Sequence, residues 1–85
     1  MSDYKIILSR PAQKQLDKLS DHIANPIFKA IRSLSKNPRP GGCKKLTGRP
    51  GYRIRVGDYR IIYEIINKEL VVTVVSLGHR KDVYE

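Results

Sequence analysis

Residues 52–66 carry an alternation of apolar and polar side chains that predicts a β-hairpin. β-branched and aromatic residues occupy alternate positions on both sides of Gly57-Asp58. A glycine that opens a two-residue loop between two such runs is typical of a type II′ turn. This loop predicts three cross-strand pairs: Val56 with Tyr59, Arg55 with Arg60, and Ile54 with Ile61.

The same alternation divides the side chains of the hairpin between the two faces of a sheet. One face carries the apolar and aromatic set, which consists of Tyr52, Ile54, Val56, Tyr59, Ile61 and Tyr63. The other face carries Arg53, Arg55 and Arg60. Like charges that face each other destabilise a strand pair by up to about 1 kcal/mol, so we interpret these arginines as an anion-binding surface. A solvated basic face is the alternative that these residues leave open.

The chain before the hairpin predicts one strand and two helices. Residues 4–8 alternate loosely and predict an opening strand. Ser9 fits an N-cap, with Pro11 in the first turn of the helix that follows. Two apolar stripes at helical spacing consist of Ala12, Leu16 and Leu19, and of Ile23, Ile27, Ala30, Ile31 and Leu34.

Pro26 lies inside the second stripe and leaves two alternatives for where that helix begins. In one, Asn25 caps a helix whose first residue is Pro26. In the other, the helix begins at Ser20-Asp21 with an irregular first turn. We predict a helix over residues 26–35 and leave its start open between the two.

Residues 70–77 form an almost continuous apolar run, which is typical of a central strand buried on both faces. A three-residue turn before it would pair Ile66 with Leu70 and Arg60 with Ser76. Even-numbered residues beyond Ser76, including Arg80, would then point to the arginine face. A two-residue turn would send Arg80 to the other face.

Residues 37–51 are rich in proline and glycine and predict a loop, with Leu46 as its anchor to the core. The predicted order is therefore β-α-α-β-β-β. This is an α+β fold in which a helical hairpin packs on a small, mostly antiparallel sheet. We expect residues 1–85 to form a single domain.

The composition points to a polyanionic partner. The chain has 17 Lys and Arg against 8 Asp and Glu, a net charge of +9, and six basic residues against one acidic residue lie between Lys44 and Arg60. Nucleic acid, a membrane surface and an acidic protein all fit such a charge. The membrane is the least favoured of the three, because no segment combines a basic stripe with a broad apolar helix face.

Cysteine and histidine usage bears on location and on cofactors. Cys43 is the single cysteine, and with no signal-peptide pattern the cytoplasm is the expected compartment. His22 and His79 belong to different segments, and no carboxylate cluster has metal-ligand spacing. We therefore expect no metal and no cofactor.

An arginine cluster can hold a phosphodiester and stabilise the extra negative charge of its transition state. In RNA the neighbouring 2′-hydroxyl is itself a nucleophile. Tyr84 could stack on a base or transfer a proton, and His79 could titrate near neutrality. The simpler alternatives are a packing role for Tyr84 and a solvated surface position for His79.

Residues 52–63 and 75–84 resemble the RelE branch of the RelE/ParE toxin superfamily of prokaryotic toxin–antitoxin modules. The motifs that carry the resemblance are basic-x-basic before the turn, Tyr-Arg-x-x-Tyr after it, and His-Arg-Lys-Asp-Val-Tyr near the end. The opening strand, the helical hairpin and the Asn-Pro-Arg-Pro loop fit as well. The resemblance therefore covers essentially the whole chain and implies a RelE-like fold.

The resemblance implies an mRNA interferase, a ribosome-dependent endoribonuclease that cleaves the message in the decoding site by metal-free attack of a 2′-hydroxyl on the adjacent phosphate. Carried over by position, the catalytic residues are Arg53, Arg55, Arg60, Arg80 and Tyr84. The basic residues around them are expected to bind the RNA: Lys44, Lys45, Arg49, His79 and Lys81.

This chain departs from well-studied members of the family at two positions, because they carry lysines where it has Arg53 and Arg55. Arginine stays protonated at any working pH and is a poor proton acceptor. Either His79 or Tyr84 then takes the proton, or catalysis consists mostly of charge stabilisation and orientation.

The resemblance also implies partners and competing functions. The partners are a RelB-like antitoxin whose C-terminal segment wraps the toxin, the ribosome with its message, and operator DNA bound through the toxin–antitoxin pair. The ParE branch has the same fold and inhibits DNA gyrase, which is one alternative function. A basic nucleic-acid-binding module without catalysis is another.

Overall fold

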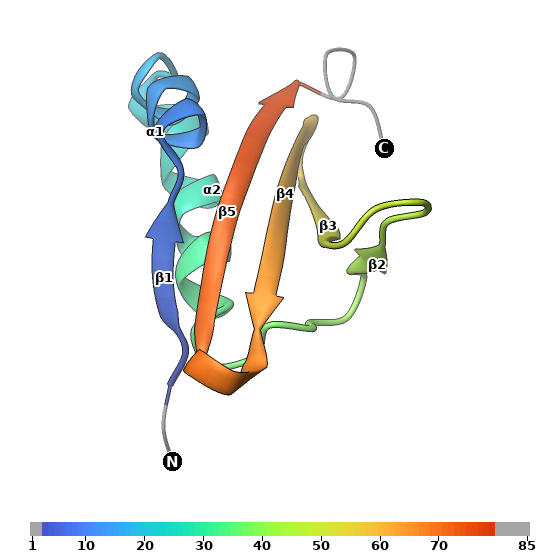
Figure 1. The fold of residues 1–85 in the computed structure, drawn as a ribbon. Coiled ribbons are helices and arrows are strands. Elements are labelled where there is room, and N and C mark those ends of the chain that lie inside the picture. The colour runs from blue at the N-terminus through green and yellow to red at the C-terminus, as the bar shows by residue number, and fades with distance from the viewer. Residues whose placement is uncertain (1–2, 80–85) are drawn as a thin grey trace.

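The computed structural model describes residues 3–79, in which two helices pack on one face of a five-stranded sheet (Figure 1). The sheet order is β1-β5-β4-β3-β2, and every neighbouring pair is antiparallel except β1 and β5. The elements in chain order are β1 (Lys5–Leu8), α1 (Arg10–Asp17), α2 (Asp21–Ser33), β2 (Lys44–Lys45), β3 (Tyr52–Val56), β4 (Tyr59–Ile66), the 3₁₀ turn η1 (Asn67–Glu69) and β5 (Val71–His79).

The predicted α+β fold is confirmed, with one strand more than the sequence indicated. The two residues of β2 pair with β3 inside the segment that was predicted to be loop. Such a short strand carries no alternation of its own, so its pairing depends on β3. In Figure 1 α2 passes behind β5 and α1 lies beyond the upper end of β1. Neither helix is long and apolar enough to cross a membrane.

The start of α1 follows the sequence prediction, and the start of α2 decides between the two alternatives. Ser9 caps α1 by accepting a hydrogen bond from the Ala12 amide at 3.2 Å. Helix α2 begins at Asp21 with Ser20 as N-cap, and it runs through Pro26 without a break. Proline there removes one helical hydrogen bond, and burial of Ile27 and Ile31 on the same helix offsets this cost. The helix ends at Ser33, two residues before the predicted end.

The core lies between the helices and the sheet and contains both predicted helical stripes. The predicted apolar face of the hairpin supplies its other side, because Ile54, Ile61 and Tyr63 are buried and Tyr52, Val56 and Tyr59 pack against them. The β3–β4 register is the predicted one, with Val56 opposite Tyr59, Arg55 opposite Arg60 and Ile54 opposite Ile61. Gly57 has a φ of 60°, as the first loop position of a type II′ turn requires.

The predicted register between β4 and β5 is wrong at both positions. The connection has four residues, so Ile66 pairs with Val71 rather than Leu70. A β-bulge then interrupts the ladder between Ile62 and Tyr63, and Arg60 pairs with Gly78 rather than Ser76. Each irregularity shifts the register by one residue.

Because the two shifts act in the same sense, they add to an even number and leave the alternation beyond Ser76 as predicted. Ser76 and Gly78 lie on the face that carries the arginines, and Leu77 lies in the core. Arg80, whose direction was at issue, lies outside the described residues.

Strand β5 is internal, between β1 and β4, but it is buried on one face only. Val72, Val74 and Leu77 are fully buried against the helices, whereas Val71, Thr73, Val75 and Ser76 are half-buried. The continuous apolar run therefore reflects helix packing on one side and valines of intermediate exposure on the other. The prediction of burial on both faces was wrong in this respect.

Hydrogen bonds to tyrosines hold the loop after α2 against the sheet. The Tyr63 hydroxyl donates to the Pro38 carbonyl at 2.7 Å, and Arg39 Nε donates to the Tyr52 hydroxyl at 3.2 Å. Burial raises the pKa of Tyr63 well above its usual value, and the bond to Tyr52 raises the pKa of Arg39. Tyr63 is therefore a neutral donor at any physiological pH.

The segment from β2 to β3 folds back through Leu46 and Gly51. Leu46 is 5% exposed, as predicted for an anchor, although it lies outside the main core cluster. Its amide donates to the Gly51 carbonyl at 3.0 Å. Gly51 has a φ of +119°, and a Cβ there would lie 3.0 Å from the backbone oxygen of Tyr63.

We expect Gly51→Ala to lower the free energy of unfolding by about 2 kcal/mol or more, because its backbone conformation and its close approach to β4 both exclude a side chain. Urea unfolding followed by circular dichroism measures the change. Gly41→Ala is the matched control, because a Cβ at Gly41 meets nothing within 4 Å, and it should change stability by less than about 0.5 kcal/mol. Equal effects of the two changes would contradict this account of Gly51.

Ser9→Ala should destabilise the protein by about 2 kcal/mol, because the Ser9 hydroxyl makes two bonds. It accepts from the Ala12 amide and donates to the Val75 carbonyl beside the bulge at 2.6 Å. Thermal unfolding monitored by calorimetry tests this. Ser20→Ala removes an N-cap serine that makes no side-chain capping bond and should cost well under half as much; a similar loss in both variants would refute the double role of Ser9.

Candidate functional site

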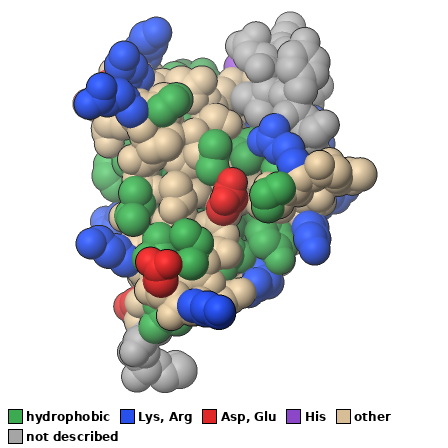
Figure 2. Space-filling view, viewed as in Figure 1, with side chains coloured by type: hydrophobic (Ala, Val, Ile, Leu, Met, Phe, Trp, Pro, Cys, Tyr) green, Lys and Arg blue, Asp and Glu red, His purple; other side chains and the backbone are tan. Residues whose placement is uncertain are grey.

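The main candidate site is a basic cavity of about 420 Å³ on the sheet face opposite the helices. Strands β2, β3 and β4 build it, and its lining residues are Lys44, Lys45, Thr47, Arg53, Arg55 and Arg60. Figure 2 looks onto this side of the sheet and shows basic side chains over the β2 and β3 region at its right-hand margin. We call this feature the basic cavity.

Strand pairing explains why these residues meet. Arg55 lies directly opposite Arg60 in the β3–β4 ladder, and Lys44 lies directly opposite Arg53 in the β2–β3 ladder. Residues that face each other across a ladder project to the same side of the sheet. Residues from three strands therefore converge, although Lys44 and Arg60 are far apart in the sequence.

The three arginines differ in burial. Arg53 is only 4% exposed, Arg60 is half-buried and Arg55 is exposed. The Nε atoms of Arg53 and Arg60 are both enclosed by protein. Arg53 therefore forms part of the protein interior beneath the cavity, and the alternative of a solvated basic face does not describe it.

The lining groups are all hydrogen-bond donors, and five of the six carry a positive charge. Guanidinium groups present several N–H donors in a plane that matches phosphate or carboxylate oxygens. Cationic ligands such as metal ions need acceptor groups, which these six side chains supply only through the Thr47 hydroxyl. The chemistry of the cavity is that of an anion-binding site.

The structure brings together five of the residues predicted from the sequence, namely Lys44, Lys45, Arg53, Arg55 and Arg60. It adds Thr47, which sequence reasoning missed although it lies between Lys45 and Arg49 in the basic loop. Arg49 is exposed on that loop and does not line the cavity. Three predicted site residues lie outside the described residues: Arg80, Lys81 and Tyr84.

His79 lies on the other face of the sheet. It pairs with Tyr59, whose ring contacts the imidazole edge-on at 5.6 Å between centroids. Both residues line a hollow of about 230 Å³ on the helix side, together with Lys18 and Leu77. The residue before His79 is Gly78, which pairs with Arg60, so alternation directs His79 away from the basic cavity. The structure does not bring His79 together with the arginines.

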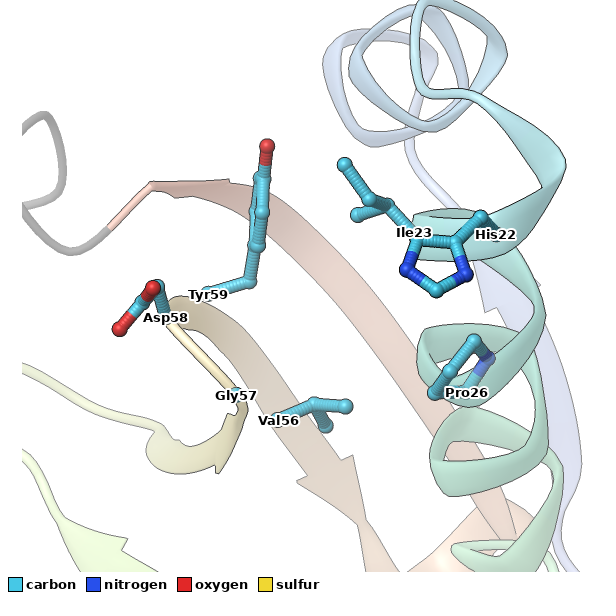
Figure 3. A pocket seen from close by; sticks show the side chains of 7 residues that line it. All are labelled: His22, Ile23, Pro26, Val56, Gly57, Asp58 and Tyr59. Carbon is cyan, nitrogen blue, oxygen red and sulfur yellow. The ribbon is translucent and has the colours of Figure 1, made fainter.

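A second hollow, of about 270 Å³, lies between α2 and the tip of the hairpin (Figure 3). His22 and Ile23 extend from α2 towards Tyr59, and Val56 points towards Pro26. The hairpin tip thus lies between this hollow, which is mostly apolar, and the basic cavity on the opposite face of the sheet.

Comparisons with known proteins agree with this geometry. The family described as ParE toxin of type II toxin-antitoxin system, parDE, matches residues 6–84. A putative RelE-like toxin protein of Escherichia coli is 28% identical over 85 residues, which are 95% of this chain and 90% of that protein. The mRNA interferase toxin RelE of E. coli strain K12 is 28% identical over 81 residues, 92% of this chain and 84% of that protein.

The solved toxin–antitoxin complex RelBE2 of Mycobacterium tuberculosis contains a chain of the same fold. It superposes with a TM-score of 0.81 at 27% identity and covers 96% of this chain and 97% of that one. The helical hairpin, the sheet and its order therefore belong to a known toxin architecture. This chain is a RelE-type member of the RelE/ParE superfamily of toxins from type II toxin–antitoxin systems.

Proposed function

We propose that this chain is an mRNA interferase that cleaves the message on the ribosome without a metal ion. The observation that carries the proposal is the basic cavity, in which Arg53, Arg55 and Arg60 converge on one face of the sheet. The RelE-named relatives support the same activity, since one of them is described as an mRNA interferase toxin. The cytoplasm is the proposed site of action.

In the proposed reaction the 2′-oxygen of the message attacks the adjacent phosphorus as the bond from phosphorus to the 5′-oxygen breaks. The 2′-hydroxyl loses its proton and the departing 5′-oxygen takes one up from water, so the products are a 2′,3′-cyclic phosphate and a 5′-hydroxyl. The guanidinium groups of Arg55 and Arg60 bind the phosphate and stabilise the charge that develops on its oxygens. Arg53 is almost fully buried and contributes a third guanidinium group to the lining of the cavity. In this scheme Arg80 stabilises the negative charge that develops on the departing 5′-oxygen.

The proton of the 2′-hydroxyl needs an acceptor or a route to solvent. Arg53 and Arg55 are unsuited to this role because guanidinium groups stay protonated. His79 is the other candidate proton acceptor among the described residues, but it points to the face of the sheet opposite the arginines. We therefore propose that Tyr84 stacks on the substrate and assists proton transfer, and that the arginines supply most of the rate enhancement through charge.

We propose that an antitoxin of the RelB type binds this chain and covers the basic cavity. The support is that the similar M. tuberculosis chain was solved in a toxin–antitoxin complex. An acidic segment would complement five cationic side chains and exclude RNA from them. Operator DNA would then be bound by the toxin–antitoxin pair.

A second candidate function is inhibition of DNA gyrase, because the matching family is the one named for ParE toxins. Such an activity needs a protein-binding surface and no phosphate chemistry. The basic cavity favours the nuclease over this alternative. A nucleic-acid-binding module without catalysis would share the cavity but leave RNA intact.

Ribosomes programmed with a defined message test the proposal directly. The wild-type chain should cut within the codon in the decoding site, and Arg55→Ala should slow cleavage by about 10²- to 10³-fold, since it removes one transition-state donor. We expect Arg80→Ala and Tyr84→Ala to slow it as well. Sequencing of the 3′ ends and single-turnover rates provide the readout.

Arg32→Ala is the matched control, because it removes the same charge from the exposed surface of α2, and it should cleave at the wild-type rate. Arg55→Ala should keep the wild-type unfolding midpoint, because its side chain is exposed. An intact message together with blocked supercoiling would favour gyrase inhibition. RNA binding without any cleavage would favour the non-catalytic module.

A further inference from the structure

Phe28, on the outer flank of α2, is the most exposed of the large apolar side chains that the structure describes. It is 47% exposed, against 41% for Ile7 and 38% for Ile66, and it lies outside the core cluster. A single exposed apolar residue is common on protein surfaces. The surroundings of Phe28 therefore decide whether its ring has a partner.

Phe28 belongs to a stripe of exposed residues along one side of α2. Four of them follow one another at intervals of four, three and four positions: Asp21, Asn25, Phe28 and Arg32. At about 100° per residue, these intervals keep the four side chains within about 60° of one another around the helix axis. His22 of the same helix turns to the hairpin tip instead (Figure 3). We call the four residues the α2 stripe.

The α2 stripe carries opposite charges at its two ends. Asp21 lies in the first turn of α2 and Arg32 in the last turn. Because they are about 16.5 Å apart along the helix axis, they cannot pair with each other. Asp21 and Arg32 are equally far from the midpoint of the stripe, and so are Asn25 and Phe28.

This symmetry of position makes the α2 stripe complementary to a second copy of itself. In two antiparallel copies related by a two-fold axis through the midpoint, Asp21 of each lies opposite Arg32 of the other, and Phe28 lies opposite Asn25. Such isologous contacts are the basis of symmetric dimers. A parallel arrangement would set like charges against each other, so the charges favour the antiparallel one.

A hollow beside Phe28 gives the ring of a second copy a place to enter. Its volume is about 310 Å³, and residues of α1, of α2 and of the turn between them line it. Leu16 and Leu19 supply apolar lining, and Asp17 and Asp21 add two carboxylates. A benzene molecule fits a cavity of about 150 Å³, so this hollow has room for a phenyl ring.

The charges around the ring match the charges around that hollow. On its other side Phe28 borders a second hollow, of about 410 Å³, whose lining includes Lys29 and Arg32. Two cations thus flank the ring that would enter, and two carboxylates, Asp17 and Asp21, line the hollow that would receive it. Carboxylates at this place disfavour RNA as the partner, since they repel its phosphates.

We propose that this chain binds a second copy of itself through the α2 stripe, as a symmetric antiparallel dimer. The Phe28 ring of each copy enters the hollow between α1 and α2 of the other, and Arg32 of each copy pairs with Asp21 of the other. The basic cavity lies on the sheet face opposite the helices, so the dimer leaves both cavities open. The proposal does not rest on the nuclease function.

Sedimentation velocity tests the dimer at about 0.15 M salt, where a Debye length of about 8 Å limits the repulsion between two chains of net charge +9. The wild-type chain should pass from monomer to dimer between about 1 and 100 µM, since two packed helices make a small interface. Phe28→Ala should weaken association by about tenfold or more, because a central aromatic anchor carries much of the binding energy.

Ile66→Ala is the matched control, because it removes a similarly exposed apolar side chain from β4. It should weaken association by less than about twofold, as is usual for a surface change outside the contact. Thermal unfolding of each variant establishes that the folded state is kept.

A charge exchange tests the pairing itself. Asp21→Lys and Arg32→Glu should each weaken self-association by about fivefold or more, because each sets like charges against one another. An equal mixture of the two variants should associate as the wild type does, since each introduced charge then meets its opposite on the other chain. A folding defect in either variant would not be repaired by mixing.

The proposal would be overturned by a wild-type chain that stays monomeric over the whole concentration series. A dimer that survives Phe28→Ala uses another surface, and a dimer that mixing fails to restore does not pair Asp21 with Arg32; either result also contradicts it. A monomer in which Phe28→Ala lowers the affinity for RNA or for the antitoxin would assign the α2 stripe to that partner instead.

Discussion

The pairing of β3 with β4 across Gly57-Asp58 is the constraint on which the site depends. The two-residue loop fixes the register, and the register fixes which side chains share a face. It places Ile54, Ile61 and Tyr63 in the core and Arg55 beside Arg60 on the other side. A slip of one residue would bury the arginines and expose the core, so core packing and anion binding enforce the same register.

Hydrogen bonds from α1 and its N-cap residue hold the backbone of β5 in its register. The Ser9 hydroxyl bonds the Val75 carbonyl beside the bulge, and the Gln15 side chain accepts from the Leu77 amide at 2.9 Å. Both groups stabilise the backbone where the ladder shifts. Without the shift, Leu77 would lie opposite Arg60 and Ser76 would face the core. The bulge therefore keeps the apolar residue inside and leaves Gly78 beside Arg60.

The two faces of the sheet differ in character. One face packs in the core, and the other carries the basic cavity with Arg53 in its lining. A buried guanidinium is costly unless the surrounding structure satisfies it, and Arg53 is 4% exposed on the face that carries the basic cavity. The short β2 strand completes this face by adding Lys44 opposite Arg53. A sheet with a firm apolar underside can hold like charges closer together than a flexible loop could.

The sequence by itself determined the hairpin, the helical hairpin, the cap at Ser9 and the convergence of three arginines, because each depends on local periodicity or on one tight turn. The tertiary structure alone decided the start of α2 at Asp21, since packing of Ile27 and Ile31 outweighs the cost of Pro26. It also decided the pairing of β5, because a run of valines fits either register and carries no alternation to read. The direction of His79 follows from that long-range pairing. The burial of Arg53 and the place of Thr47 in the cavity depend on how the segment around β2 lies beside β3, and no local pattern encodes them.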